Sequence, residues 1–391
     1  MTDERAIVDR AISALLAEHP PEELGAVEFL GAAFDAGLAW IHFPPGLGGL
    51  GLSSGLHEHV YNTLTAAGAP DYISATPIGF GMAGPTIASH GTAEQIDRHL
   101  RPIFTGEEVW CQLFSEPCAG SDLASLATRA EPTDGGWLVN GQKVWTTLGH
   151  VAQFGLLVAR TDPHAPKHAG LTYFLLDMST PGVDVRPLRQ MSGDSEFNEV
   201  YLTDVLVPDS ARVGAVGEGW QVAMTTLANE RLVLDATIPR HGGAIDTAVR
   251  LWADREDKSS PAARLLRDRL LELWVRDDVA WLTGLRAGDM RDQATPGPEG
   301  SVAKIVRSGI NQQTYDLCLD ILGAEGLLYN ATDMAEPDVT NPKYMFLRTR
   351  AQSIEGGTTE ILKDVVALRV LGLPPSHRPD KGRPWNEVPR S

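Results

Sequence analysis

Two short polar segments contain the residues whose types and spacing are best suited to chemistry. The first is Ser115-Glu116-Pro117-Cys118-Ala119-Gly120-Ser121-Asp122, a loop rich in hydroxyl and backbone N–H groups. The second is Trp145-Thr146-Thr147, which places a large aromatic face beside threonine hydroxyl groups. Joined by the hairpin between them, the two segments predict one wall of a pocket for a flat ring system with polar edges and phosphates. That description fits a flavin.

Each segment also has a simpler explanation. The Ser115 loop can be a plain surface loop that follows a strand. Trp145 can fill the core of a β-domain, as Trp137 and Trp220 can, so aromatic character alone does not decide its role. The choice depends on the pattern in which the two segments occur.

Composition limits the classes of partner and the compartment. The chain has 391 residues and a net charge of −18, which repels nucleic-acid phosphates and anionic membranes. Cys111, Cys118 and Cys318 lack metal-ligand spacing, so we expect no metal site and a reducing, cytoplasmic location. We read no signal peptide in the acidic N-terminus, and we expect no membrane insertion because no apolar run is long enough.

The pattern of apolar residues predicts an α+β multidomain fold. We expect an N-terminal α-helical domain over residues 1–108 and a middle antiparallel β-barrel or sandwich over 109–213. A C-terminal four-helix bundle over 214–373 and an extended tail over 374–391 complete the prediction. The sequence has no Gly-x-Gly-x-x-Gly after a strand, which argues against a Rossmann domain.

The expected elements follow from two periodicities. Helical spacing occurs at 6–18, 22–37, 57–67, 82–104, 220–234, 241–254, 261–288, 300–322 and 359–371. Strand patterns occur at 109–114, 128–131, 137–145, 154–160, 171–177, 183–187 and 199–207. Asp134-Gly135-Gly136 predicts a hairpin turn between the second and third of these strands.

Four motifs occur in a fixed order on this α/β/α background. They are Phe114-Ser115-Glu116-Pro117-x-Ala119-Gly120-Ser121-Asp122, Val139-Asn140-Gly141-x-Lys143-x-Trp145-x-Thr147, Asn229-Glu230-Arg231 and Gly356-Gly357-Thr358-Thr359-Glu360-Ile361. Over nearly the whole chain, their order and spacing resemble the acyl-CoA dehydrogenase family. The resemblance implies FAD between the β-domain and the bundle, and α,β-dehydrogenation of an acyl-CoA thioester with hydride transfer to flavin N5. It also implies an electron-transfer flavoprotein as the electron acceptor.

By family position, the resemblance assigns FAD contacts to Leu113, Phe114, Ser115, Ser121, Trp145, Thr147, Arg255, Asp320, Gly323, Thr358 and Glu360. Three departures accompany these assignments. Cys118 replaces the usual glycine, and Asp320 replaces a glutamine. Arg255 lacks the usual Phe-Gly after it and can be part of a solvated charge run. Gly323 and Thr358 can act simply as helix caps.

Two glutamates compete for the role of the base that removes the α-proton. Most family members carry the base where this chain has Gly356, and Glu355 lies one residue early. A minority, including isovaleryl-CoA dehydrogenase, carry it in a Glu-Arg-Leu-Val-Leu sequence, which occurs here as Glu230-Arg231-Leu232-Val233-Leu234. We therefore predict Glu230 as the base, Glu355 as the runner-up, and the Gly356 N–H as a donor to the thioester carbonyl. The alternative for Glu230 is a solvated helix glutamate paired with Arg231.

The resemblance further implies thioester contacts from Ser121, Asn229, Arg231 and Gly357, with Ser121 facing the pantetheine–phosphate arm of the ligand. A base on the bundle is associated in the family with branched, long or bulky acyl groups, including steroid side chains. A homotetramer or dimer is the expected assembly, with a heterotetramer as the alternative. Two other functions stay open: an oxygen-using flavin enzyme on the same scaffold, and a subunit of a mixed tetramer that lacks a base.

Overall fold

The computed structural model describes residues 2–235, 242–292, 299–329, 338–376 and 380–388, and for residues 2, 74–75, 230–235, 287–292 and 299 it describes the backbone alone. The chain divides into two compact units. Unit 1 contains Met1–Leu188, Glu196–Val233 and Pro379–Ser391, and unit 2 contains Arg189–Ser195 and Leu234–Arg378. No helix among the described residues is long and apolar enough to cross a membrane.

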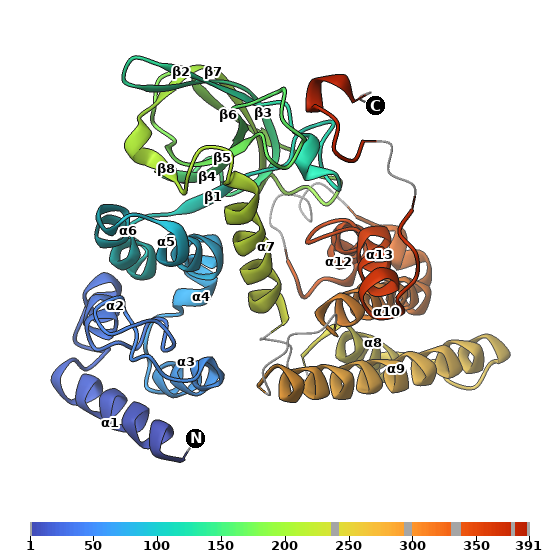
Figure 1. The fold of residues 1–391 in the computed structure, drawn as a ribbon. Helices are drawn as coiled ribbons and strands as arrows, with labels where there is room; N and C mark the ends of the chain where they lie inside the picture. Colours follow the sequence, from blue (N-terminus) through green and yellow to red (C-terminus); the bar gives the residue numbers. More distant parts are fainter. Residues whose placement is uncertain (1, 236–241, 293–298, 330–337, 377–379, 389–391) are drawn as a thin grey trace. The chain divides into compact units, whose positions relative to one another are not determined.

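The N-terminal part of unit 1 is helical, as the periodicity predicted (Figure 1). Its helices are α1 (Thr2–Glu18), α2 (Ala26–Asp35), α3 (His57–Ala66), α4 (Tyr72–Ala75), α5 (Gly84–His90) and α6 (Ala93–Thr105). The single helical pattern expected at 82–104 is two helices, because Thr92 begins α6 with a capping box. Its hydroxyl accepts a hydrogen bond from the Gln95 N–H, and the Gln95 side chain accepts one from the Thr92 N–H.

The middle of unit 1 is a curved β-sheet (Figure 1). Its strands are β1 (Trp110–Leu113), β2 (Arg129–Thr133), β3 (Gly136–Thr147), β4 (Phe154–Arg160), β5 (Leu171–Asp177), β6 (Val183–Leu188), β7 (Phe197–Val207) and β8 (Arg212–Val213). The order is β6-β7-β3-β2-β4-β5-β8, with β1 paired to β4. The predicted hairpin joins β2 to β3, and β4 and β5 begin and end where the sequence placed them.

The sheet differs from the prediction in two respects. It was expected to be antiparallel, but β1 runs parallel to β4, and so does β2 at Arg129 opposite Arg160. The two-residue strand β8, which the sequence pattern did not show, pairs with β5. Parallel pairing makes β1 and β4 run in the same direction with Leu113 opposite Leu157, so the Ser115 loop leaves β1 beside the middle of β4.

Helix α7 (Gly219–Asp235) begins in unit 1, and its first half packs there through buried hydroxyl groups. Thr226 lies 2.9 Å from the Thr86 hydroxyl of α5 and 3.0 Å from the Tyr173 hydroxyl of β5. The sequence predicted this helix as part of the C-terminal bundle. Its described side chains instead contact the N-terminal helices and the sheet, because a buried hydroxyl needs hydrogen-bond partners and finds them there.

Unit 2 contains the other C-terminal helices. They are α8 (Ala244–Asp254), α9 (Pro261–Asp292), α10 (Glu299–Leu322), α12 (Pro342–Arg348) and α13 (Thr359–Arg369). Their core includes Ile245, Leu270, Leu273, Leu317, Cys318 and Ile321. The short segment Arg189–Ser195 belongs to this unit, since Tyr344 donates a hydrogen bond to Asp194 (2.8 Å) and Tyr329 donates one to the Ser192 carbonyl (2.6 Å).

A buried histidine in the N-terminal helices makes stability depend on pH. The His57 ring stacks on Phe80 with centroids 5.3 Å apart, and neither ring nitrogen has a hydrogen-bond partner among the described residues. Burial, reinforced by the charge of His42, lowers the pKa of His57 to about 4. A folded-state pKa below the unfolded value favours the folded state above pH ~6.5 and removes that preference as pH falls toward 4.

We therefore expect the free energy of unfolding to fall by up to about 3 kcal/mol between pH 6.5 and 4 on account of His57. The variant His57→Phe should show a flatter dependence over this range, because phenylalanine suits the aromatic cluster and carries no proton. Urea unfolding at several pH values measures the effect, with the variant of the exposed histidine His164→Phe as the control. Equal slopes for His57→Phe and the unmodified chain would contradict the prediction.

Candidate functional site

The Ser115 loop is closed by its own backbone and tied to strand β3. The Glu116 N–H donates to the Ala119 carbonyl (3.1 Å), and the Ala119 N–H donates to the Glu116 carbonyl (3.0 Å). The Val144 N–H of β3 donates to the Ser115 carbonyl at 2.9 Å. The two predicted segments are therefore hydrogen-bonded neighbours, as a common wall requires.

The fully buried side chain of Lys143 is hydrogen-bonded to this loop. The Lys143 ammonium donates to the Phe114 carbonyl (3.1 Å), the Val158 carbonyl (2.9 Å) and Glu116 Oε1 (2.9 Å). Its side chain is 0% exposed, so these bonds replace the water that a buried ammonium would lose. Lys143 and Glu116 belong to the sequence motifs, but the sequence predicts no role for them, because their pairing becomes visible only when β3 lies against the loop.

The Glu116 carboxylate also holds the backbone that follows the loop, at Ala127 and Thr128. It accepts hydrogen bonds from the backbone N–H groups of Ala127 (2.6 Å) and Thr128 (2.9 Å). Burial alone would raise the pKa of Glu116, but the Lys143 ammonium and these hydrogen bonds hold the pKa below its usual value. Burial lowers the pKa of Lys143, and the charge of Glu116 opposes that shift. Together the two side chains fix the chain on either side of residues 117–126.

Trp145 is presented outward by an irregularity in β3. The register between β3 and β7 shifts between Lys143 and Thr146, and Trp145 has a left-handed backbone with φ of +62°. That conformation is costly for a bulky residue, and β-bulges of this kind often turn a side chain toward a site. The indole is 59% exposed and meets Phe197 only edge-on, at 5.9 Å. It therefore does not fill the core, and it offers a flat apolar face for stacking.

The structure limits which atoms at the end of β1 can contact a bound ring. The side chains of Leu113 and Phe114 are buried, and Phe114 meets Tyr173 edge-on in the core. Any contact they make with a bound ring must therefore come from the backbone. Ser121 is exposed and Ser115 half-buried, so their hydroxyls remain accessible.

Cys118 does not strain the loop. It is a free, exposed cysteine, and its backbone is outside the left-handed region that would require the glycine usual in the family. The replacement of glycine therefore adds a side chain toward solvent without altering the turn. Among the described residues, no group of three or more His, Cys, Asp or Glu side chains is placed to hold a metal ion.

In unit 2 the structure brings together two segments that the sequence assigned to FAD. The Arg255 guanidinium donates to the Ile321 carbonyl at 2.8 Å, which places it beside the turn of Asp320 and Gly323. Asp320 is paired with Arg269 (2.7 Å), an arginine that the sequence analysis did not single out. This pairing partly offsets the negative charge that Asp320 adds in place of the usual glutamine. Gly323 follows the end of α10 with φ of +62°, as expected of a helix cap.

The turn before α13 contains the other unit 2 candidates. Thr358 accepts a hydrogen bond from the Ile361 N–H (3.2 Å) and so caps the helix that begins with Thr359 and Glu360. Gly356 and Gly357 have φ of +62° and +96°, in the region that favours glycine. Lys304 donates a hydrogen bond to the Gly357 carbonyl.

The structure describes the surroundings of one of the two candidate bases, Glu355. Glu355 is held by Arg348, whose Nη1 lies 3.1 Å from both carboxylate oxygens. Glu230 and Arg231 belong to α7, but their side chains lie outside the part of the chain that the structure describes. The neighbouring Asn229 amide donates to the Thr225 carbonyl (3.0 Å), a local bond within the helix.

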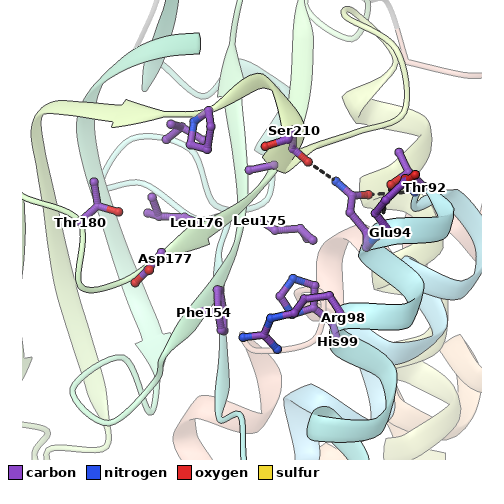
Figure 2. Close-up of a pocket in the computed structure, with 14 residues that line it drawn as sticks. Thr92, Glu94, Arg98, His99, Phe154, Leu175, Leu176, Asp177, Thr180 and Ser210 are labelled. Atoms are coloured by element: carbon purple, nitrogen blue, oxygen red, sulfur yellow. Dashed lines mark hydrogen bonds between the residues drawn. The ribbon is translucent and has the colours of Figure 1, made fainter. Parts of the chain in front are cut away.

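A separate cavity of about 570 Å³ opens between α6 and the sheet (Figure 2). Figure 2 shows Arg98 and His99 of α6 opposite Phe154, Leu175 and Asp177 of the sheet. Gln95 spans its rim and donates to the Ser210 and Arg212 carbonyls. None of the predicted site residues lines this cavity. It is lined by Phe154 at the start of β4, whereas the Ser115 loop follows Leu113, which lies opposite Leu157. We therefore place the candidate site at the Ser115 loop and Trp145.

Comparison with protein families agrees with the order of these segments. The models for the N-terminal, middle and C-terminal domains of acyl-CoA dehydrogenases match residues 3–107, 111–205 and 217–371. The chain belongs to the acyl-CoA dehydrogenase family. The predicted resemblance and the predicted α/β/α architecture are thereby confirmed. Family membership implies FAD as the cofactor, and the exposed Trp145 face beside a firmly held loop of N–H and hydroxyl groups fits a flat, polar-edged ring.

Relatives of known sequence extend the comparison. The chain is 43% identical over 357 residues to "Acyl-CoA dehydrogenase FadE34" of Mycobacterium tuberculosis, an alignment that covers 90% of this chain and 47% of that protein. It is 37% identical over 351 residues to "Acyl-CoA dehydrogenase IpdE1" of the same organism, covering 87% of this chain and 86% of the relative. The chain thus spans about half the length of one relative and most of the other.

A solved structure shows the same fold. The "ChsE4-ChsE5 complex from Mycobacterium tuberculosis" superposes with a TM-score of 0.71 at 24% identity, over 96% of this chain and 99% of the matched chain. The "Tcur3481-Tcur3483 steroid ACAD" also gives a TM-score of 0.71 at 24% identity, over the same shares of the two chains. At this level of identity the likeness concerns the fold alone.

Proposed function

We propose that this member of the family catalyses FAD-dependent α,β-dehydrogenation of an acyl-CoA thioester, with Glu230 as the base that removes the α-proton. The observation that carries the proposal is Trp145, an exposed indole held in a costly backbone conformation beside the Ser115 loop. FAD, when bound, supplies the acceptor for the β-hydride. The remaining chemistry belongs to residues of the chain: binding, orientation and removal of one proton.

The Ser115 loop orients the ring and the ligand. In this proposal, backbone N–H groups of the loop and the Ser115 hydroxyl donate to the polar edge of the ring, while Trp145 and Thr147 flank it. Because the Lys143–Glu116 pair fixes the loop before binding, little reorganisation is needed, which is the condition for effective electrostatic stabilisation. Ser121 and Gly357 are proposed to contact the thioester ligand, together with Asn229 and Arg231.

In unit 2, Arg255 is the proposed contact for the FAD phosphates. Further FAD contacts are proposed from Asp320, Gly323, Thr358 and Glu360. A guanidinium suits this role because it can donate two parallel hydrogen bonds to a phosphate. The Arg269–Asp320 pair supports the proposal, since Asp320 already has a cationic partner, and Arg255 is bonded to the neighbouring Ile321 carbonyl.

Two observations favour Glu230 over Glu355 as the base. Both oxygens of Glu355 lie 3.1 Å from one Arg348 nitrogen, so its carboxylate already has a local partner. Gly356 occupies the usual position of the base with φ of +62°, a conformation that a glutamate would adopt only with strain. The Gly356 N–H remains available in this proposal as a donor to the thioester carbonyl.

A panel of CoA thioesters tests the function directly. The purified protein is titrated anaerobically with straight, branched and steroid acyl-CoA thioesters, and loss of the flavin absorption near 450 nm, expected of a flavin on reduction, is recorded. We expect reduction by at least one bulky thioester, because a base on α7 is associated in the family with branched or steroid acyl groups. Absence of reduction by every thioester, in protein that retains FAD, would contradict the proposal.

The same protein preparation separates the alternatives. Rapid reoxidation of the reduced flavin by air would favour an oxygen-using enzyme, whereas slow reoxidation supports an electron-transfer flavoprotein as acceptor. A flavin-free, unstable protein would favour a base-lacking partner subunit.

Cys111, Cys118 and Cys318 are free thiols, which supports a reducing, cytoplasmic location.

Helix α9 supports assembly with further copies of the chain. Its outer surface exposes the apolar side chains of Leu265, Leu271, Trp274, Val275, Val279, Leu282 and Leu285. A continuous apolar stripe on a long helix is expected to be covered in the assembled protein. We propose a homotetramer or dimer, which light scattering of the purified chain measures. A chain that becomes stable only with a second, different subunit would favour a heterotetramer.

A further inference from the structure

The C-terminal tail is packed onto unit 1 beyond the end of the matched family models. Those models end at residue 371, and the sequence analysis expected an extended surface tail. Instead, Trp385 is only 8% exposed and begins a short helical turn, Trp385–Glu387. The Trp385 N–H donates to the Ala165 carbonyl (3.0 Å), and the Asn386 N–H donates to the Pro163 carbonyl (3.1 Å). The tail is therefore an anchored part of unit 1.

The Trp385 side chain makes two contacts that lead back to the Ser115 loop. Its indole N–H donates to the Ser125 carbonyl at 3.2 Å. Its ring lies 4.2 Å from the Arg160 guanidinium, which is buried at the end of β4. Arg160 in turn donates to the Ala124 carbonyl (2.6 Å) and the Leu126 carbonyl (3.1 Å). A buried cation over an indole is a favourable contact, so Trp385 stabilises Arg160 in the orientation that holds residues 124–126.

A second link from the tail runs through Lys167. The Asp380 carboxylate lies 2.7 Å from the Lys167 ammonium, which is 8% exposed. The same ammonium donates to both oxygens of Asp122 at 2.8 Å. Asp122 follows Ser121 directly, and it also accepts a hydrogen bond from the Ser125 hydroxyl. Asp380 of the tail thus fixes the orientation of Lys167, and Lys167 in turn holds Asp122, the residue next to Ser121.

We propose that the tail segment 380–388 is a positioning element for residues 121–126, and that it sets the affinity for the phosphate-bearing arm of the CoA thioester through Ser121. The proposal rests on the proposed function for the identity of the ligand. Its structural part rests on contacts within unit 1 alone. Lys143 and Glu116 hold the two ends of the loop segment, and the tail holds the stretch between them.

Two variants and one control test the proposal in the FAD-containing protein. Deletion of residues 380–391 removes both links, and Trp385→Phe keeps an aromatic ring over Arg160 while removing the donor to Ser125. Deletion of residues 389–391 alone is the control, because all the contacts described above are retained. Hydrogen–deuterium exchange of residues 121–128 and the affinity for coenzyme A, measured by calorimetry, are the readouts.

We expect faster exchange at residues 121–128 and about tenfold weaker binding of coenzyme A in the deletion variant, in line with the loss of a desolvated cation–aromatic contact. Trp385→Phe should give a smaller change in the same direction, and the control none. With an active thioester, KM should rise while kcat stays within about twofold, because the phosphate-bearing arm lies away from the reacting carbons. If the tail had only a structural role, its deletion would lower thermal stability without raising KM relative to kcat.

Two results would overturn the proposal. One is unchanged exchange at residues 121–128 after deletion of residues 380–391. The other is faster exchange with unchanged affinity for coenzyme A. Failure of the proposed function is distinguishable, because it would appear as absence of flavin reduction in the intact protein, while the exchange measurement still decides whether the tail holds the loop.

Discussion

Replacement of Glu230 by glutamine is expected to abolish substrate-dependent reduction of the flavin while FAD stays bound. An amide of the same shape cannot accept the α-proton, and a positioned base contributes about 10²–10⁴-fold to such a step. We therefore expect the rate of anaerobic flavin reduction to fall by about 10³-fold or more. Stopped-flow absorption with the most reactive thioester of the panel measures it.

The matched control is Glu355→Gln. Glu355 is paired with Arg348 at 3.1 Å, so its replacement should disturb the turn before α13 without removing the base. We expect reduction within about tenfold of the unmodified rate, since a partly exposed ion pair contributes about 1 kcal/mol or less. Full retention of reduction in Glu230→Gln, together with its loss in Glu355→Gln, would reverse the assignment.

The second large effect is expected from Lys143→Met. This change removes the buried ammonium and leaves the Glu116 carboxylate without its countercharge in a water-excluded position. Breaking a buried pair by removing one partner costs about 3–5 kcal/mol. The free energy of unfolding from urea titration should fall by that amount, and FAD should dissociate more readily because the Ser115 loop loses its support.

Two further variants distinguish the buried pair from an ordinary surface pair. The double variant Lys143→Met with Glu116→Gln should recover part of the loss, since it leaves no buried charge. The exposed pair of Arg186 and Asp184 is the control, and Arg186→Met should change stability by less than about 1 kcal/mol. A loss of equal size in Lys143→Met and Arg186→Met would contradict the role of Lys143.

Periodicity predicted much of the fold because it records which faces are buried. The strands at 154–160 and 171–177 begin and end as predicted, since both are buried nearly throughout and turn residues bound them. The break between α5 and α6 was missed, because apolar residues continue across Gly91, which ends α5 in an extended conformation, and Thr92, whose capping box begins α6. The parallel pairing of β1 with β4 was missed for another reason: strand direction depends on how the chain returns, which local pattern does not contain.

The site was predictable to a similar, partial extent. The Ser115 loop and Trp145 were singled out correctly as neighbours, and the Val144 to Ser115 hydrogen bond bears this out. The left-handed conformation of Trp145 could not be inferred, because it depends on a shift of register against β7. The role of Glu230 stays a prediction, since its side chain lies outside the described residues.

Sequence alone determined the family and the order of helical and β-domains, and it predicted the flavin-binding segments and a base displaced from Gly356. Each of these depends on residue type at fixed spacing, which is local information. Only the tertiary structure decided which charges are neighbours: Lys143 with Glu116, Arg269 with Asp320, and Asp380 with Lys167. These partners lie 27 to more than 200 residues apart. Burial makes the pairings of Lys143 and Lys167 matter, because a charge removed from water requires a countercharge or hydrogen bonds nearby, whereas Arg269 and Asp320 form a partly exposed pair.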